Sequence, residues 1–286
     1  MAIALVMAAG TTSIAPPASA DESVGWIVKC DFHHRLKADP IVYPRQPGAG
    51  HYHDFLGNKS TNAYSTYRSL QRAGTNCTAP ADRAAYWIPS LYSRGDLRRP
   101  SEGKFYYRSV TQPHRDVRPF PPGLRIVAGN SGATGLQPYD IVHWGCEMLE
   151  RDDRSFRRPR DCGKGFVEAK ITFPDCWDGV HLDSPDHKRH MAYSFENDRD
   201  RQVCPRSHPV PVPSLSFALE WPVHDGRRIK LSSGPYYTLH GDFFNAWGQE
   251  KLRDLVRRCI RRGVDCGTLG EGQLPIALPE VRAPAV

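Results

Sequence analysis

The sequence lacks the motifs of several common functional classes. It has no C-x-x-C pair, which argues against a zinc ribbon. The small, polar segment from Gly129 to Gly135 has neither the Gly-Lys-Ser/Thr end of a phosphate-binding loop nor the G-x-S-x-G pattern of a nucleophile elbow. No nucleic-acid-binding motif is recognisable, and no apolar run reaches transmembrane length. These absences argue against those classes, so the function must be sought in other residues.

The composition favours a β-rich globular protein. Of the 286 residues, 40% are hydrophobic and 24% are charged, which is close to globular averages. The 25 prolines and 24 glycines predict many turns and few long helices. A chain of this length forms one large domain or two small ones, and length alone does not decide between them.

The first twenty residues resemble a signal peptide. They carry no charged side chain, are apolar from Ala2 to Ala9, and end in Ala18-Ser19-Ala20, a small-residue cleavage pattern. A basic segment at the start is missing. We therefore assign residues 1–20 to a signal peptide, expect the mature chain to begin near Asp21, and predict a secreted, extracellular protein.

The cysteines predict a set of disulfides. An even count of eight in an exported chain is typical of disulfides, whereas the same count in a cytosolic chain would suggest metal binding. The bridge between Cys176 and Cys204 would stabilise the fold by roughly 3 kcal/mol by closing a loop. Pairing cysteines that are near one another along the chain predicts the bridges Cys30–Cys77, Cys146–Cys162, Cys176–Cys204 and Cys259–Cys266.

The formal net charge of +7 has two interpretations. Arginines cluster at 94–99, 151–160 and 257–262, and acidic residues alternate with them. A solvated surface explains this pattern. Attraction to an anionic polymer, such as a cell-wall or uronic-acid polysaccharide, explains it as well.

The hydrophobic pattern predicts strands and a single helix. Phe166 to Phe173 alternates strictly between apolar and polar residues and is the cleanest strand. The helix is expected from Ala246 to Arg262, with Asn245 as N-cap and Gly263 after its end. Further strand-like segments lie at 25–32, 84–92, 103–110, 123–129, 139–146, 191–195, 215–221 and 236–240.

We therefore predict a mainly β fold, a single-domain β-sandwich or jelly-roll, loop-rich and disulfide-stapled, with one C-terminal α-helix. The domain is expected to span residues 21–270, followed by a loose, proline-rich tail at 271–286.

The stretch from Pro174 to His190 has the composition of a site. It holds three histidines, four aspartates, one cysteine and one tryptophan in seventeen positions, which no packed strand or helix requires. It leaves the cleanest strand, and a Cys176–Cys204 bridge would close it into a loop.

Several blocks together resemble the secreted DUF1996 family. The resemblance spans about residue 30 to residue 265, and its ordered set of blocks is more specific than any single one. It implies an extracellular protein, and because some members are joined to carbohydrate-binding modules, it implies a polysaccharide partner by association. The blocks are Asp39-Pro40-Ile41-Val42, Gly50-His51-Tyr52-His53-Asp54-Phe55-Leu56-Gly57, Phe173-Pro174-Asp175-Cys176-Trp177-Asp178-Gly179, Cys204-Pro205, His208-Pro209 and Leu239-His240-Gly241-Asp242-Phe243.

The histidines suggest a divalent metal as cofactor. In an extended segment His51 and His53 point to one face and can present two imidazoles to one point. His181 and His190 are further candidate ligands, because neutral imidazoles suit transition metals.

Without a metal, the same blocks fit acid–base attack on a polysaccharide. A hydrolase needs two carboxylates about 5 to 10 Å apart, and Asp54, Asp183 and Asp242 are the candidates. A lyase would use His51 or His240 as base, with an arginine neutralising a uronate.

Two tryptophans lie beside these blocks. Trp177 and Trp247 would stack on sugar if their rings are exposed, although the core is the more common place for tryptophan.

Two functions therefore follow from the sequence. One is a secreted hydrolase or lyase that acts on polysaccharide through a His/Asp cluster. The other is a non-catalytic cell-wall or glycan-binding protein in which the same residues only lock long loops by bonding backbone groups.

Overall fold

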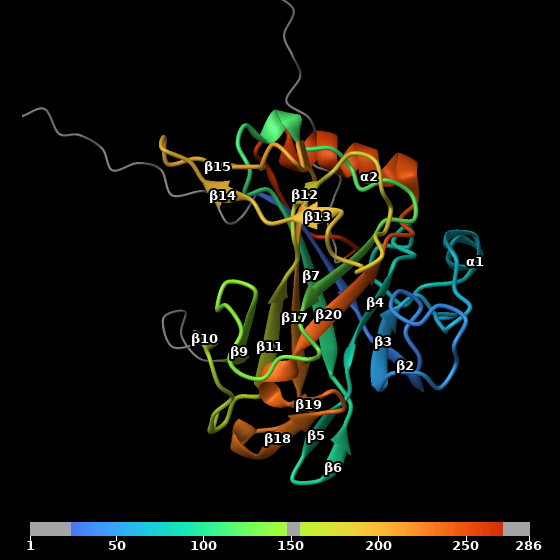
Figure 1. The fold of residues 1–286 in the computed structure, drawn as a ribbon, viewed down its shortest axis with the longest axis vertical. Helices are drawn as coiled ribbons and strands as arrows, with labels where there is room; N and C mark the ends of the chain where they lie inside the picture. The colour runs from blue at the N-terminus through green and yellow to red at the C-terminus, as the bar shows by residue number, and fades with distance from the viewer. Residues whose placement is uncertain (1–23, 148–154, 271–286) are drawn as a thin grey trace, which may run out of the picture.

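Two β-sheets packed face to face form the body of the protein (Figure 1). The computed structural model describes residues 24–147 and 155–270. The predicted signal peptide, residues 1–20, and the predicted tail, residues 271–286, lie outside the described residues. In Figure 1, α2 and the short strands β12 to β15 lie at one end of the molecule, and β5, β6, β18 and β19 lie at the other.

The larger sheet has seven strands within the described residues. Apart from the parallel pair of β1 and β21, its neighbouring strands are antiparallel. Its order is β10 (Ser155–Phe156), β9 (Val142–Cys146), β11 (Val167–Thr172), β17 (Ser214–Trp221), β7 (Glu102–Arg108), β1 (Gly25–Cys30) and β21 (Asp265–Thr268).

The smaller sheet has five antiparallel strands in the described part of the chain. Its order is β2 (Phe32–Lys37), β3 (Tyr52–Gly57), β4 (Ala85–Pro89), β20 (His240–Phe244) and β8 (Arg125–Gly129).

Shorter elements cover the ends of the two sheets. The small sheets are β19 (Gly234–Pro235), β18 (Ile229–Leu231), β5 (Leu91–Ser93) and β6 (Asp96–Arg98); β13 (Met191–Ala192), β12 (Cys176–Trp177) and β16 (Val210–Pro211); and β14 (Phe195–Glu196) with β15 (Gln202–Val203). The helical elements are α1 (Tyr67–Arg72), α2 (Gln249–Leu255), the 3-10 turns His114–Asp116, Gly226–Arg228 and Tyr236–Thr238, and a π-helical turn at Val256–Ile260.

Aromatic side chains fill the space between the two sheets. Tyr86 of the smaller sheet stacks on Phe105 of the larger one, with ring centroids 3.9 Å apart. Phe217 contacts both rings edge-on. A Cβ at Gly241 would lie 3.0 Å from Ile171 Cδ1, so β20 comes as close to β11 as a residue without a side chain permits.

The alternating pattern of Phe166 to Phe173 produces the expected strand, β11. Val167, Ala169 and Ile171 are buried, and Glu168 and Lys170 form an ion pair of 3.6 Å on the other face. The fold is therefore mainly β, with several sheets, and the prediction of fold class is confirmed.

All eight cysteines lie in the described residues and all are paired. The bridges are Cys30–Cys77, Cys146–Cys162, Cys176–Cys204 and Cys259–Cys266, as predicted. Four disulfides indicate an oxidising compartment. In the described part of the chain, no helix combines the length and apolarity needed to cross a membrane.

The C-terminal helix is present but shorter than predicted. It begins at Gln249, after Gly248 as N-cap, and continues through the π-helical turn to Ile260. Asn245 does not cap it, because the helix begins four residues later; the buried Asn245 side chain accepts from the backbone nitrogen of Trp247 and donates to the carbonyls of Phe120 and Pro121. The strand expected at 236–240 is instead a 3-10 turn that leads into β20.

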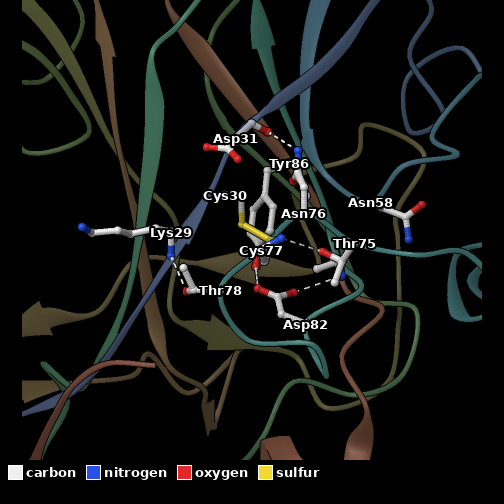
Figure 2. The surroundings of a disulfide bond; sticks show 12 residues. Lys29, Cys30, Asp31, Asn58, Thr75, Asn76, Cys77, Thr78, Asp82 and Tyr86 are labelled. Carbon is white, nitrogen blue, oxygen red and sulfur yellow. Dashed lines mark hydrogen bonds between the residues drawn. A yellow bond between two sulfur atoms is a disulfide. The ribbon is translucent and has the colours of Figure 1, made fainter. Parts of the chain in front are cut away.

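A buried chain of hydrogen bonds lies beside the Cys30–Cys77 bridge (Figure 2). Trp247 Nε1 donates to Tyr107 Oη at 2.9 Å, the Oη atoms of Tyr107 and Tyr86 are 2.5 Å apart, and Tyr86 donates to Asp82. Burial disfavours the charged carboxylate and raises the pKa of Asp82 to about 7. Asp82 therefore keeps its proton in the core at pH values at which an exposed aspartic acid has already lost it.

This acid predicts a pH dependence of stability. Between pH 4 and 7 the folded protein holds a proton on Asp82 that the unfolded chain has released, so this group stabilises the fold less as pH rises. The free energy of unfolding of wild type, measured relative to Asp82→Asn by urea denaturation, should fall by a few kcal/mol from pH 4 to pH 7.5. The exposed control Asp140→Asn keeps Asp82 and should therefore show the same fall as wild type. Parallel curves for wild type and Asp82→Asn would contradict the assignment.

Candidate metal centre

The smaller sheet presents polar side chains on the face that points away from the main core. Residues opposite one another on neighbouring strands share a face, and so do residues two apart on one strand. Phe55, Trp87 and Asp242 form one row across β3, β4 and β20. His53 and His240 each lie two residues from that row. Both imidazoles therefore share this face with the Asp242 carboxyl.

Three imidazoles converge at one point on this face. His240 Nε2 lies 3.1 Å from His51 Nε2 and 3.4 Å from His53 Nε2. The rings of His51 and His53 have centroids 4.3 Å apart. The H-x-H pair thus presents two imidazoles to one point, and β20 supplies a third from a distant part of the sequence.

Backbone carbonyls fix the tautomers of two of these histidines. His53 Nδ1 lies 2.9 Å from the carbonyl oxygen of Ala38, and His240 Nδ1 lies 2.9 Å from that of Thr238. A carbonyl only accepts, so each Nδ1 carries the hydrogen and each neutral ring keeps a lone pair on Nε2. These two lone pairs face each other, and no hydrogen bond can join them.

The spacing of the nitrogens suits a bound transition-metal ion. On a tetrahedron with metal–nitrogen bonds of about 2.0–2.1 Å, two ligand atoms lie about 3.3 Å apart. The observed distances of 3.1 and 3.4 Å bracket this value. Donation of the other ring nitrogen to a backbone carbonyl is also the usual way in which proteins orient metal-binding histidines.

Asp242 provides a carboxylate beside the imidazoles. It is fully buried, both of its oxygens lack a hydrogen-bond partner, and Oδ2 lies 4.0 Å from His240 Nε2. A buried carboxyl group without partners is costly unless a ligand satisfies it. One ligand atom each from Asp39, His53 and Asp242 also lie within 4.8 Å of one another. The centre can therefore offer three nitrogens and one or two oxygens.

Burial keeps the imidazoles neutral. Loss of solvation lowers the pKa of His51 to about 4 and that of His240 to about 3, and it holds the pKa of His53 well below 6.5. The pKa of Asp242 is raised well above its usual value, again mainly by burial. Neutral imidazoles are the form that binds metal, so the histidines need not lose protons first.

The stretch from Pro174 to His190 lies next to this centre but does not supply its histidines. His181 has an exposed side chain and bonds to Asp178 at 2.6 Å. His190 is buried, and its Nε2 donates to the carbonyl oxygen of Arg125 at 2.7 Å. Neither joins the group of His51, His53 and His240. Their contacts are those of residues that hold a loop.

Two predicted catalytic carboxylates are engaged in ion pairs elsewhere. Asp54 is buried and bonds to Arg35 Nη2 at 2.9 Å and to Ser90 Oγ at 2.7 Å. It points to the opposite face from His53, because adjacent strand residues alternate. Asp183 bonds to Arg125 at 3.0 Å and to His187 at 2.9 Å. Only Asp242 of the three carboxylates faces the histidines directly.

The predicted stacking tryptophans have other contacts. Trp247 is completely buried and donates to Tyr107, so its ring is part of the core and cannot meet a sugar. The reason is its place just before the C-terminal helix, where its ring packs against Trp26 and Tyr107 of the larger sheet. Trp177 is half-buried and donates from Nε1 to the carbonyl oxygen of His181 at 2.6 Å.

Two residues of this region were not assigned a role from the sequence. Asp39 accepts from the backbone nitrogens of Ile41 and Val42 and shares the group with His53 and Asp242. The sequence feature that could have identified Asp39 was its position in the Asp39-Pro40-Ile41-Val42 block. Lys188 donates from Nζ to the carbonyl oxygen of Gly129, which is paired with His240. No sequence pattern pointed to that contact.

The comparisons with known proteins give a family and nothing more specific. No curated protein and no solved structure matched the chain. The family model described as "Domain of unknown function (DUF1996)" matches residues 39–247. This range includes the three converging histidines, Asp39 and Asp242. The chain therefore belongs to the DUF1996 family.

Proposed function

We propose that this protein is a secreted metal-binding protein that acts on polysaccharide, with the ion held by His51, His53 and His240. The observation that carries the proposal is the pair of Nε2 lone pairs of His53 and His240, which face each other at 3.4 Å. Asp242, with both oxygens unsatisfied, is the expected fourth ligand. Three imidazole ligands favour Zn²⁺, Cu²⁺, Fe²⁺ or Ni²⁺ over Mg²⁺ and Ca²⁺, which prefer oxygen ligands.

The burial of the ligands supports a reactive rather than a sealed centre. His53 and His240 are almost inaccessible, whereas His51 is partly exposed. Solvent therefore reaches the centre from the side of His51, which leaves room for a further ligand. A metal in such a place polarises a substrate oxygen or lowers the pKa of a bound water.

Polysaccharide as the substrate class rests on other grounds. The basic surface suits an anionic polymer, and the export predicted from the first twenty residues suits an extracellular substrate. Family resemblance points the same way by association. Hydrolysis and β-elimination both agree with this centre, because an ion can stabilise the oxyanion in either reaction.

A non-catalytic glycan-binding protein is the second candidate. The ion pairs of Asp54 with Arg35 and of Asp183 with Arg125 favour it, since both occupy carboxylates that a two-carboxylate hydrolase would need. In that case the metal centre serves stability alone.

Metal binding by the three histidines is the first test. Metal-free wild type should take up one transition-metal ion per chain, with a rise in melting temperature. His53→Ala and His51→Ala should each lower the affinity by at least about 100-fold, because each removes a ligand. Elemental analysis measures the metal content, and isothermal titration calorimetry measures the affinity.

The matched control for this experiment is His181→Ala, an exposed histidine outside the cluster. It should bind metal like wild type. The His51→Ala variant is expected to fold, because this side chain is only partly buried. A loss of metal affinity in this variant therefore does not result from misfolding. Absence of a stoichiometric ion in wild type after supplementation would refute the proposal.

Catalysis is tested with a polysaccharide screen. Activity of the metal-loaded protein should disappear with a chelator and should fall at least about 100-fold in Asp242→Asn, which removes a carboxylate ligand. Asp183→Asn should keep most of the activity, because that carboxylate is bonded to Arg125 and His187. Activity that survives chelation and both substitutions would place the reaction elsewhere. Binding of metal and glycan without turnover would favour the second candidate.

A further inference from the structure

A pocket lies next to the proposed metal centre on the same face of the smaller sheet. Its volume is about 250 Å³, and Val127 and Gly129 of β8 form part of its wall. In the sheet these two residues are the partners of Asp242 and His240. Neighbouring strands are about 4.8 Å apart, so the pocket begins one strand away from the ligands.

The walls of this pocket combine apolar and polar groups. Pro138, Ile141 and Met191 provide apolar surface, and Asn130 and Gln137 provide amides. Tyr193 lies at its edge with about a third of its surface exposed, and its hydroxyl donates to the carbonyl oxygen of Thr172. Sugar rings have apolar faces and polar edges, and a mixed lining of this kind suits them.

Lys188 gives the pocket a positive charge on the side of the metal centre. It lines the pocket, and its ammonium donates to the carbonyl oxygen of Gly129. The residue as a whole is solvent-exposed. Gly129 is the strand partner of His240, so the Lys188 ammonium also lies beside the metal centre. Lys188 thus stands between the pocket and the centre.

Two larger hollows of the described surface do not offer this combination. One is lined by side chains of the C-terminal helix, among them Arg253, Arg257 and Arg258, and the other by Arg94, Asp225 and two further arginines. Asp254 and Asp225 already pair with these arginines. Neither hollow is lined by a residue that is paired in the sheet with His240 or Asp242.

We propose that this pocket binds one acidic sugar residue of the polysaccharide, a hexuronate, with Lys188 paired to its carboxylate. The neighbouring sugar linkage then lies toward His240 and Asp242. This placement rests on the proposed function, whereas recognition of the acidic sugar does not require the ion.

The test compares an acidic oligosaccharide with its neutral counterpart. A trimer of galacturonic acid should bind wild type at least about tenfold more tightly than the same trimer after reduction of its carboxyl groups, as measured by calorimetry at low salt. Lys188→Met should abolish this preference. The control Lys164→Met removes an exposed lysine outside the pocket and should preserve it.

The outcomes separate the pocket from the metal centre. Equal affinity of wild type for both trimers, or an undiminished preference in Lys188→Met, would overturn the proposal. The titrations are repeated on chelator-treated protein and on His51→Ala. A preference for the acidic trimer that persists there supports the pocket even if no metal binds, and metal binding without the preference leaves only the metal centre.

Discussion

The alternation of side chains along β20 and β3 determines the architecture around the candidate centre. Gly241 and Phe243 of β20 face the aromatic layer between the sheets, so His240 and Asp242 must face the other way. The same rule places Leu56 in the main core and His53 beside the imidazole of His240. A shift of either strand by one residue would bury the polar set among aromatic rings, which the packing of the core forbids.

The polar set would be unstable without the cover above it. Ile41, Phe55, Leu70 and Trp87 form a second, smaller core on the outer face of the smaller sheet. The segment that carries Ala38 and Asp39 lies over the same face and supplies the carbonyl that orients His53. Burial by this cover keeps the imidazoles neutral and raises the pKa of Asp242. The cover therefore creates the conditions in which an ion is the natural partner of these groups.

Local features of the sequence predicted much of the fold and only part of the centre. The cysteine pairs, the strand β11 and the family blocks could be read directly, because each depends on residues that are near one another or on period-two alternation. His51, His53, His240 and Asp242 could be named as polar residues in distinct blocks. Their convergence could not be derived, because it depends on the strand order β3-β4-β20. The histidine-rich stretch was misleading in this respect, since density of polar residues marks a loop that needs internal bonds as readily as a site. The burial of Trp247 likewise depends on long-range packing against Trp26 and Tyr107.

The Cys176–Cys204 bridge closes a segment that owes its rigidity to the disulfide, whereas the rest of the candidate site owes its rigidity to the sheet. His53, His240 and Asp242 belong to strands held by the sheet and its core, and His51 directly precedes β3. Lys188, Met191 and Tyr193 belong to the segment that the bridge closes, where regular structure is limited to strands of two residues. Reduction of this one bond would loosen one wall of the pocket while the backbone that positions the imidazoles stays in the sheet. In a reducing environment the proposed metal centre would therefore keep its backbone while the pocket is incomplete, and only oxidation would join the two parts into one site.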